Sequence, residues 1–337
     1  MATEHRQCHA SASVFGQGTL RVLTSIGAGV ALPTRDDTRR PARPPAPVAE
    51  GGLDWLRRTL ETPFAGVERE VRERLAQAPI QLNEFGFDRY GLRPDDAARV
   101  YVLGALLYRH WFRVETHGIE RVPAGRVLLI ANHSGQFGYD GVMLATSMLL
   151  EAEPPRLARG MGEFFFWRMP WLGGLATQMG SIVGTPENCT ALLDADECLM
   201  VFPEGARGAN KPFRKRYQLQ HFGHGFMRLA LATDTPVIPV GIVGAEEQQP
   251  GLANFEGIGH ALGLPSFPIT VSMPWFGPLG APFALPVKYH LHFGEPLHFS
   301  GGANEEDDAI AARVTAVKQA IADLLAEGLR SRRGIFR

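Results

Sequence analysis

The sequence predicts an α/β fold, in which a mostly parallel sheet is flanked by helices and preceded by a helical region. Short apolar runs alternate with helix-like segments from Arg126 onward, which is typical of parallel strands covered by helices. In addition, a polar stretch directly follows each of two apolar runs, 127–130 and 199–202. Parallel sheets bind ligands at the carboxyl ends of their strands, so these two stretches are expected to meet in one crevice.

The chain divides into three expected regions. Residues 1–50 end in a run rich in proline and are expected to be disordered. Residues 51–113 carry apolar side chains at helical spacing and are expected to form an N-terminal helical region. Residues 114–330 show the alternation of strands and helices and are expected to form the α/β domain.

Periodicity places the individual elements. A helix is expected over 53–76 with an interruption at Pro63, and Pro94 suits the first turn of a helix that runs to about Phe112. The expected elements of the α/β domain are strand 126–131, helix 141–152, an aromatic segment 163–179, strand 180–183, a short helix near 188–195, strand 198–202, helix 219–232, strand 237–243, strand 287–293 and an amphipathic helix 304–330.

Composition narrows the class of protein. The 45% hydrophobic content supports a substantial packed core. The net charge of −1 gives no general attraction to nucleic acid, so no such partner is expected and any anion site must be local. Three cysteines without a C-x-x-C spacing argue against a disulfide framework or a zinc knuckle, and they fit a reducing compartment.

The sequence predicts no membrane-spanning segment. Residues 1–6 lack the long apolar stretch of a secretory signal. No window reaches the roughly 18 uncharged apolar residues that a spanning helix needs, and the nearest, 164–183, is broken by Arg168 and Pro170. Any membrane contact is therefore expected to be interfacial.

Two polar motifs resemble the glycerolipid acyltransferase family, whose best-known members are 1-acylglycerol-3-phosphate acyltransferases. The first motif, Asn132-His133 with Asp140 downstream, is similar to the catalytic Asn-His…Asp motif of that family. Six residues separate His133 from Asp140 here, whereas the family usually has four. The second motif, 203–207, matches the acceptor motif Pro-Glu-Gly-x-Arg letter for letter.

Two further blocks fit the family in motif order. Residues 180–184 stand where the family has a Gly-x-Ile strand, but 185–188 (Thr-Pro-Glu-Asn) replace the Arg that is expected after it. Residues 237–240 match a later strand with a buried proline. The resemblance runs from about Val114 to Glu295 and implies a fold like that of glycerol-3-phosphate acyltransferase.

The resemblance implies an O-acyltransferase of phospholipid biosynthesis. Such an enzyme moves a fatty acyl group from acyl-CoA or acyl carrier protein to a hydroxyl of a glycerolipid acceptor such as lysophosphatidic acid. It needs no cofactor besides the acyl donor substrate. The expected location is cytoplasmic, peripheral on the inner face of a membrane, with the membrane surface as a partner.

His133 and Asp140 are the expected catalytic residues. A neutral His can remove a proton from a hydroxyl near pH 7, an effect worth roughly 10²–10⁴-fold in rate. A carboxylate on the other ring nitrogen fixes its tautomer and orientation. Gly135 and Gly138 permit backbone conformations that could return Asp140 to the ring despite the longer loop. In the alternative reading Gln136 or Ser134 orients the ring and Asp140 only caps the following helix.

The second motif is expected to bind the substrate. Arg207 can bind phosphate or ester oxygens with two hydrogen bonds, and Glu204 can hold Arg207 or bind the acceptor hydroxyl. The alternative is a surface turn with a solvated ion pair, which contributes little. A run of cations follows and is expected either to be a solvated face or to bind lipid headgroups or coenzyme A phosphates. The expected substrate-binding residues are Glu204, Gly205, Arg207, Lys211 and Arg214.

Several other functions are also compatible with the sequence. A neutral acceptor such as mono- or diacylglycerol is compatible with the unusual motif spacing and the missing Arg. A thioesterase would use water in place of the alcohol. A non-catalytic lipid-binding protein would not need the base at His133. The aromatic segments 163–179 and 251–286 fit an acyl-chain groove, a membrane interface or ordinary core packing.

No metal site is expected from the sequence. His221 and His224 are three residues apart, but no cysteine or third ligand lies nearby, and such pairs are usually ordinary helix residues. The chain also lacks the G-x-S-x-G elbow of α/β-hydrolases and the phosphate-binding G-x-x-x-x-G-K-[ST] loop.

Overall fold

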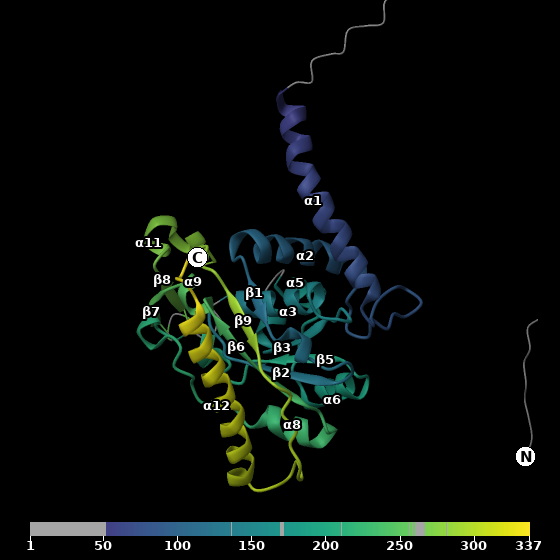
Figure 1. Ribbon diagram of the computed structural model, residues 1–337, viewed down its shortest axis with the longest axis vertical. Coiled ribbons are helices and arrows are strands. Elements are labelled where there is room, and N and C mark those ends of the chain that lie inside the picture. Colours follow the sequence, from purple (N-terminus) through teal and green to yellow (C-terminus); the bar gives the residue numbers. More distant parts are fainter. Residues whose placement is uncertain are drawn as a thin grey trace, which may run out of the picture. The chain divides into compact units, whose positions relative to one another are not determined.

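A computed structural model describes residues 52–337 apart from 136, 169–171, 210, 256, 258, 260–266 and 281 (Figure 1). The disorder expected for residues 1–50 therefore lies outside the described residues. Within them, no helix combines the length and the apolar character needed to cross a bilayer.

The described residues form one seven-stranded sheet and a separate two-stranded hairpin. The order of strands in the sheet is β1 (Glu115–His117), β9 (His290–Phe293), β6 (Val237–Val243), β2 (Val127–Ala131), β5 (Cys198–Val201), β3 (Ala158–Gly162) and β4 (Ile182–Val183). The five strands from β6 to β4 are parallel, whereas β9 runs antiparallel to β6 and β1 runs parallel to β9. The hairpin pairs β7 (Gly251–Phe255) with β8 (Phe267–Thr270). The predicted mostly parallel sheet is confirmed.

Alternate residues of β2 belong to two separate cores, one on each face of the sheet. Leu129 packs in a core with the helices α1 (Gly52–Gln77), α2 (Pro94–Leu106), which continues as the π-helical turn η1 (Leu107–Trp111), and α3 (Tyr139–Leu150). Ile130 packs in the second core with α6 (Pro186–Asp194), α8 (Gly225–Thr233) and α12 (Asp307–Ser331). Successive residues of a strand point to opposite faces, so a strand that is apolar throughout requires this cover on both sides.

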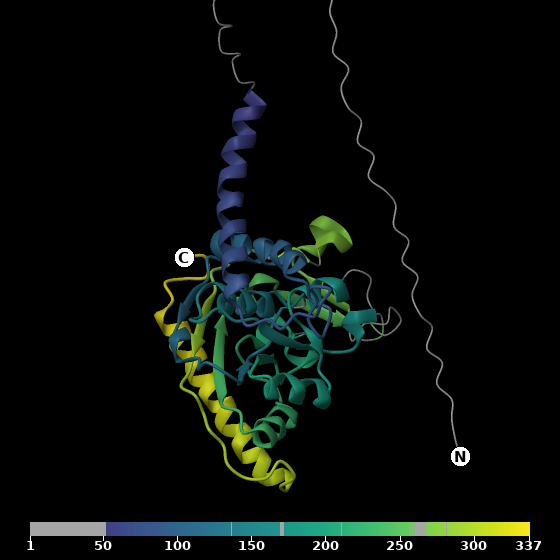
Figure 2. The same cartoon turned by 90° about the vertical axis from the view of Figure 1, so that its right-hand side faces the viewer.

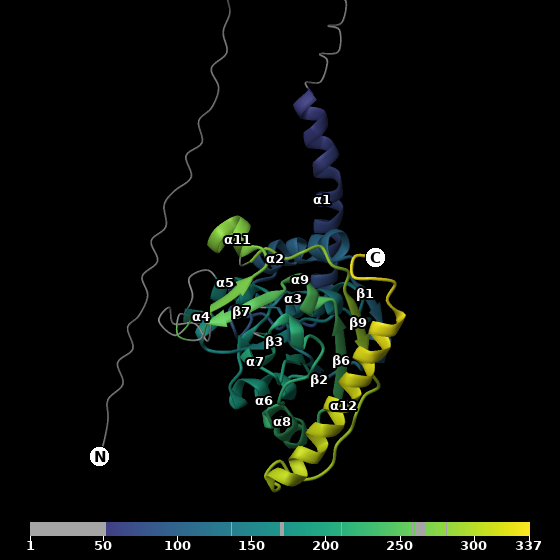
Figure 3. The same ribbon diagram turned by 90° about the vertical axis from the view of Figure 1, so that its left-hand side faces the viewer.

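The helices beside the sheet follow the sequence pattern closely. Figures 1 and 2 show the C-terminal part of α1 crossing α2, and Figure 3 shows α12 along β6 and β9. The predicted apolar stripe of α12 is buried. The remaining short elements are η2 (Ile119–Arg121), α4 (Phe165–Arg168), α5 (Leu172–Gln178), α7 (Ala206–Ala209), η3 (Phe213–Lys215), α9 (Ala245–Gln248), α11 (Met273–Phe276) and η4 (Gly277–Gly280).

Two element predictions are wrong. Helix α1 is continuous through Pro63, because a proline removes only one helical donor and the following turns are anchored by buried Val67 and Val71. The helix expected over 219–232 begins only at Gly225. The backbone N–H of Gln220 instead donates to Glu204, so residues before α8 bond to the turn after β5 and not to their own helix.

Strand β3 was not predicted, because it contains two glycines and the almost fully buried Arg159. The Arg159 guanidinium lies 2.7 Å from the Asp88 carboxylate and 2.6 Å from that of Glu197. The other oxygen of Asp88 accepts the backbone N–H groups of Tyr90 and Leu92. One buried cation therefore ties the loop before α2 to the centre of the sheet.

Replacing Arg159 should destabilise the protein strongly. Arg159→Ala leaves two carboxylates without their cation, and breaking a buried pair in this way costs about 3–5 kcal/mol. The free energy of unfolding from urea titration measures this loss. Arg99→Ala is the matched control, because its ion pair with Asp96 is largely exposed and contributes at most about 1 kcal/mol. Equal losses in the two variants would contradict the structural role of Arg159.

Candidate active site

The loop after β2 begins with a side chain that extends the sheet. Asn132 is fully buried, its amide nitrogen donates to the carbonyl oxygen of Ile242 at 3.1 Å, and its amide oxygen accepts the Ile242 N–H at 2.7 Å. This amide pairs with a residue of β6 in the way a backbone group would. Asn132 therefore fixes the point at which the loop carrying His133 leaves the sheet.

His133 and Asp140 are in contact. The ring Nδ1 of His133 lies 2.7 Å from Oδ2 of Asp140, which is fully buried in the first turn of α3. The same oxygen accepts the Ser134 N–H, and Oδ1 accepts the Gly141 N–H. The His133 ring packs on Phe202, with ring centroids 4.5 Å apart. The carboxylate is thus held by the loop and the helix while it holds the imidazole.

The two glycines of the longer loop have the predicted role. Gly135 and Gly138 have φ of +78° and +66°, a region that other residues rarely adopt. Gly138, and not Asp140, is the N-cap of α3. Gln136, the alternative orienting residue, lies outside the described residues. The hydroxyl of Ser134 is buried and has no hydrogen-bond partner in the described part of the chain, so it does not orient the ring there.

Glu204 of the second motif holds the backbone of the first motif in place. Glu204 is 2% exposed, and its Oε1 accepts the backbone N–H of His133 at 2.9 Å while Oε2 accepts that of Gln220 at 2.7 Å. Gly205 turns the chain with a φ of +56°. Of the two roles expected for Glu204, an ion pair with Arg207 is not seen among the described residues, where its oxygens accept the backbone N–H groups of His133 and Gln220.

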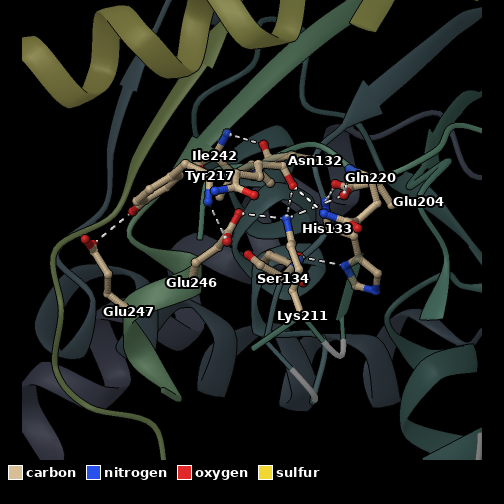
Figure 4. A network of polar contacts seen from close by, with 12 residues as sticks. Asn132, His133, Ser134, Glu204, Lys211, Tyr217, Gln220, Ile242, Glu246 and Glu247 are labelled. Atoms are coloured by element: carbon tan, nitrogen blue, oxygen red, sulfur yellow. Dashed lines mark hydrogen bonds and ion pairs between the residues drawn. The ribbon is translucent and has the colours of Figure 1, made fainter. Parts of the chain in front are cut away.

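Lys211 belongs to the same buried network (Figure 4). Its side chain is only 3% exposed, and Nζ lies 3.0 Å from Glu246 and 3.5 Å from Glu204. Glu246 also accepts the Tyr217 N–H at 2.7 Å. The run of cations predicted around Lys211 is therefore not a single surface, because Lys211 points inward and lies between the carboxylates of Glu204 and Glu246.

Arg207, Arg214, Lys215 and Arg216 are exposed cations of this region. Within the residues that the structure describes, Arg207 makes no hydrogen bond or ion pair. Its turn nevertheless packs tightly on the first motif, since a Cβ at Gly208 would lie 3.0 Å from the carbonyl oxygen of His133. The backbone turn that carries Arg207 is therefore in contact with the loop that carries His133.

Sequence reasoning missed Glu246, Glu247 and Gln248. They form α9 directly after β6 and are all buried. Glu247 accepts the Tyr217 hydroxyl at 2.9 Å, and that hydroxyl accepts the Gly244 N–H at the same distance. The signal was present, because these polar residues follow an apolar strand at its carboxyl end, as the two recognised motifs do.

Electrostatics favour a basic His133. Burial alone would lower the pKa of this imidazole, but the charge and the hydrogen bond of Asp140 outweigh it, and the pKa is raised above its ordinary value. With Nδ1–H donated to Asp140, Nε2 carries the lone pair. The side chain is 19% exposed. The arrangement can therefore accept a proton at Nε2 from a bound hydroxyl.

A cavity lies at the amino ends of the strands, whereas His133 follows the carboxyl end of β2. The cavity has a volume of about 450 Å³ and is lined by residues at the amino ends of the strands, among them Gly125 before β2, Leu157 before β3 and Cys198 at the start of β5. His133, Glu204 and Arg207 are absent from its lining. This cavity is separate from the His133 site.

Two known proteins resemble part of the chain. A chicken (Gallus gallus) enzyme, named for synthesizing storage lipids independently of DGAT1/2, is 25% identical over 218 residues, which are 63% of this chain and 60% of that protein. The crystal structure of the 1-acyl-sn-glycerophosphate acyltransferase of Thermotoga maritima matches with a TM-score of 0.45 at 18% identity, over 71% of this chain and 81% of that one.

The family is shown by two further comparisons. Residues 113–243, which contain both motifs, match the model of the family described as Acyltransferase. An uncharacterized protein of Mycobacterium tuberculosis is 35% identical over 277 residues, covering 81% of this chain and 76% of the relative. The chain belongs to the acyltransferase family, as its motifs predict.

Proposed function

We propose that this acyltransferase moves a fatty acyl group from acyl-CoA or acyl carrier protein to a hydroxyl of a glycerolipid acceptor such as lysophosphatidic acid. The observation that carries the proposal is the 2.7 Å contact between His133 Nδ1 and Asp140. It leaves Nε2 as a general base at the carboxyl edge of the sheet. No nucleophilic side chain is required, because the acceptor supplies the attacking oxygen.

His133 and Asp140 support direct transfer of the acyl group from the donor thioester to the acceptor hydroxyl. Nε2 of His133 removes the proton of the acceptor hydroxyl as its oxygen attacks the thioester carbonyl carbon. The carbon–sulfur bond then breaks, an ester forms, and the imidazolium returns the proton to the leaving thiolate. Asp140 stabilises the imidazolium and holds the tautomer, as the carboxylate of a serine-protease triad does.

Two buried groups, Glu204 and Lys211, hold His133 in position. Glu204 fixes the backbone of His133, and Lys211 neutralises Glu204. Substrate anions are left to the exposed guanidinium of Arg207, which can bind a phosphate with two hydrogen bonds. Arg214, exposed on η3, is a second candidate for the same anion.

An acylglycerol is the second candidate acceptor. Where the family has an Arg after the Gly-x-Ile strand, Thr185 caps α6 by accepting the Asn188 N–H at 3.3 Å. This position therefore supplies no positive charge for a phosphate. The name of the chicken relative, which refers to storage-lipid synthesis, supports the same candidate.

An exposed aromatic surface beside the site fits a membrane interface. Trp275 is 83% and Phe276 59% exposed. Phe276 packs on Phe283, which packs edge-on against Trp111. The neighbouring Pro282 carbonyl accepts the hydroxyl of Tyr139, the residue before Asp140. Aromatic side chains of this kind anchor peripheral proteins at the headgroup level, so the acceptor would reach the site from the membrane.

Assays with a panel of acceptors test the function. Purified protein with radiolabelled acyl-CoA should acylate lysophosphatidic acid or an acylglycerol, and His133→Ala should lower the rate by at least about 10²–10⁴-fold, because the base is lost. Arg207→Ala should raise KM for lysophosphatidic acid and leave KM for monoacylglycerol unchanged. Release of free fatty acid alone would indicate a thioesterase, and lipid binding without turnover would indicate a binding protein.

The pH dependence tests the His133–Asp140 pair. Only neutral His133 is a base, so kcat/KM should rise with pH through a pKa above the ordinary value of about 6.5. Asp140→Asn removes the negative charge that raises this pKa, so the acid limb should move to lower pH while the rate falls by about 10²–10⁴-fold. In the control Asp96→Asn the limb should not move. An unchanged limb in Asp140→Asn would refute the pairing.

Vesicle binding tests the aromatic surface. The double substitution of Trp275 and Phe276 by Ser should weaken sedimentation with phosphatidylglycerol vesicles more than about tenfold, since burying each side chain is worth about 1.5–3 kcal/mol. Phe85→Ser is the matched control, because Phe85 is 75% exposed and lies outside this surface. Equal weakening by both changes would contradict a specific membrane-facing surface.

A further inference from the structure

Three potential metal ligands meet at the β1–β9 edge of the sheet. Glu115 and His117 lie on β1 and His290 on β9, and one donor atom from each lies within 4.8 Å of the other two. The parallel register pairs Glu115 with His290 and His117 with His292, so all four side chains share one face. The cluster joins two residues of β1 to one of β9, a strand near the other end of the chain.

The spacing of the donors suits a tetrahedral ion. Nδ1 of His290 lies 3.4 Å from Oε2 of Glu115. Zinc bonds to nitrogen and oxygen are about 2.0–2.2 Å long, and at a tetrahedral angle two such donors stand about 3.3–3.5 Å apart. These two atoms therefore already have the separation that a shared ion requires.

The histidine rings on this face of the sheet pack closely together. His290 and His292 are each 5% exposed, and the Nε2 of each is buried with no hydrogen-bond partner among the residues described. The His117 ring stacks on that of His292, with centroids 4.5 Å apart. The His117 ring also stacks on that of His290, whose Nδ1 is the atom that faces Glu115.

The surrounding charges leave one carboxylate oxygen available. Lys288 Nζ binds Oε1 of Glu115 and leaves Oε2 facing His290. A hydrogen-bonded outer partner of this kind orients a metal-binding carboxylate.

We propose that Glu115, His117 and His290 form a binding site for Zn²⁺ or a similar divalent transition-metal ion. Two imidazoles and a carboxylate are a ligand set that zinc accepts, with the fourth position left for water. Glu115 and His117 are exposed and give the ion access from solvent, while the buried His290 anchors it. The ion would clamp β1 to β9.

His292 and α12 complete the surroundings. A Cβ at Gly328 of α12 would lie 2.7 Å from His292 Nε2, so only glycine allows the helix to approach this ring. His292 therefore supports the ring of His117 by stacking and is not itself a ligand in the proposal. The clamp would hold the sheet edge on which the last turns of α12 rest.

Calorimetric titration of tag-free, EDTA-dialysed protein with ZnCl₂ tests the proposal. We expect one ion per chain and a melting temperature that rises on adding Zn²⁺. His117→Ala and Glu115→Gln should each weaken binding at least about 100-fold, because even outer-shell partners contribute 10–100-fold. Both residues are exposed, and metal-free melting curves of the variants check that the fold is kept.

His221→Ala is the matched control. Its ring stands 6.3 Å from that of His224. These two residues are a second histidine pair within the described part of the chain, and the substitution should leave the zinc affinity unchanged. Absence of binding in the parent protein would overturn the proposal. Binding that survives both His117→Ala and Glu115→Gln, or that disappears with His221→Ala, would place the ion elsewhere and overturn it equally. Acyl transfer is not needed for any of these measurements.

Discussion

The carboxylate of Glu204 holds the two motifs of the active site together. It accepts the backbone N–H of His133, 71 residues earlier in the chain, and that of Gln220. A buried charge is tolerated only when hydrogen bonds and an opposite charge replace its water. The two N–H groups and Lys211 meet this requirement. The position of His133 therefore depends on a carboxylate that lies outside its own loop.

The same arrangement recurs at three neighbouring strands. Sheet order places β6, β2 and β5 side by side, and each is followed at its carboxyl end by buried polar side chains: Glu246 after β6, Asn132 after β2 and Glu204 after β5. These residues bond to each other's loops through Lys211 and through backbone groups. The buried network thus links the loops that follow these three strands. His133 and Arg207 extend from the linked loops.

Local patterns predicted the parts of this site that local chemistry determines. The pairing of His133 with Asp140 followed from the resemblance of the first motif to the family, and the two glycines of the loop permitted it. Strand β6 was predicted at its observed bounds because it is apolar throughout. The inward direction of Lys211 could not be predicted, since it is decided by Glu246, which is 35 residues away. Strand β1 has only three residues, and its partner lies in the last quarter of the chain, so neither it nor its histidine cluster was visible in the sequence.

The longer loop between His133 and Asp140 packs against the end of α9. A Cβ at Gly135 would collide with the side-chain amide nitrogen of Gln248, while the amide oxygen of Gln248 accepts the Tyr289 hydroxyl at 2.5 Å. Tyr289 in turn packs on Phe112, whose ring meets that of Tyr139 at the start of α3. Gly135 therefore rests against a buried polar and aromatic group of residues that leads back to the helix carrying Asp140. Since this group is built from residues outside both motifs, a loop of unusual length can retain the contact between the imidazole and its carboxylate.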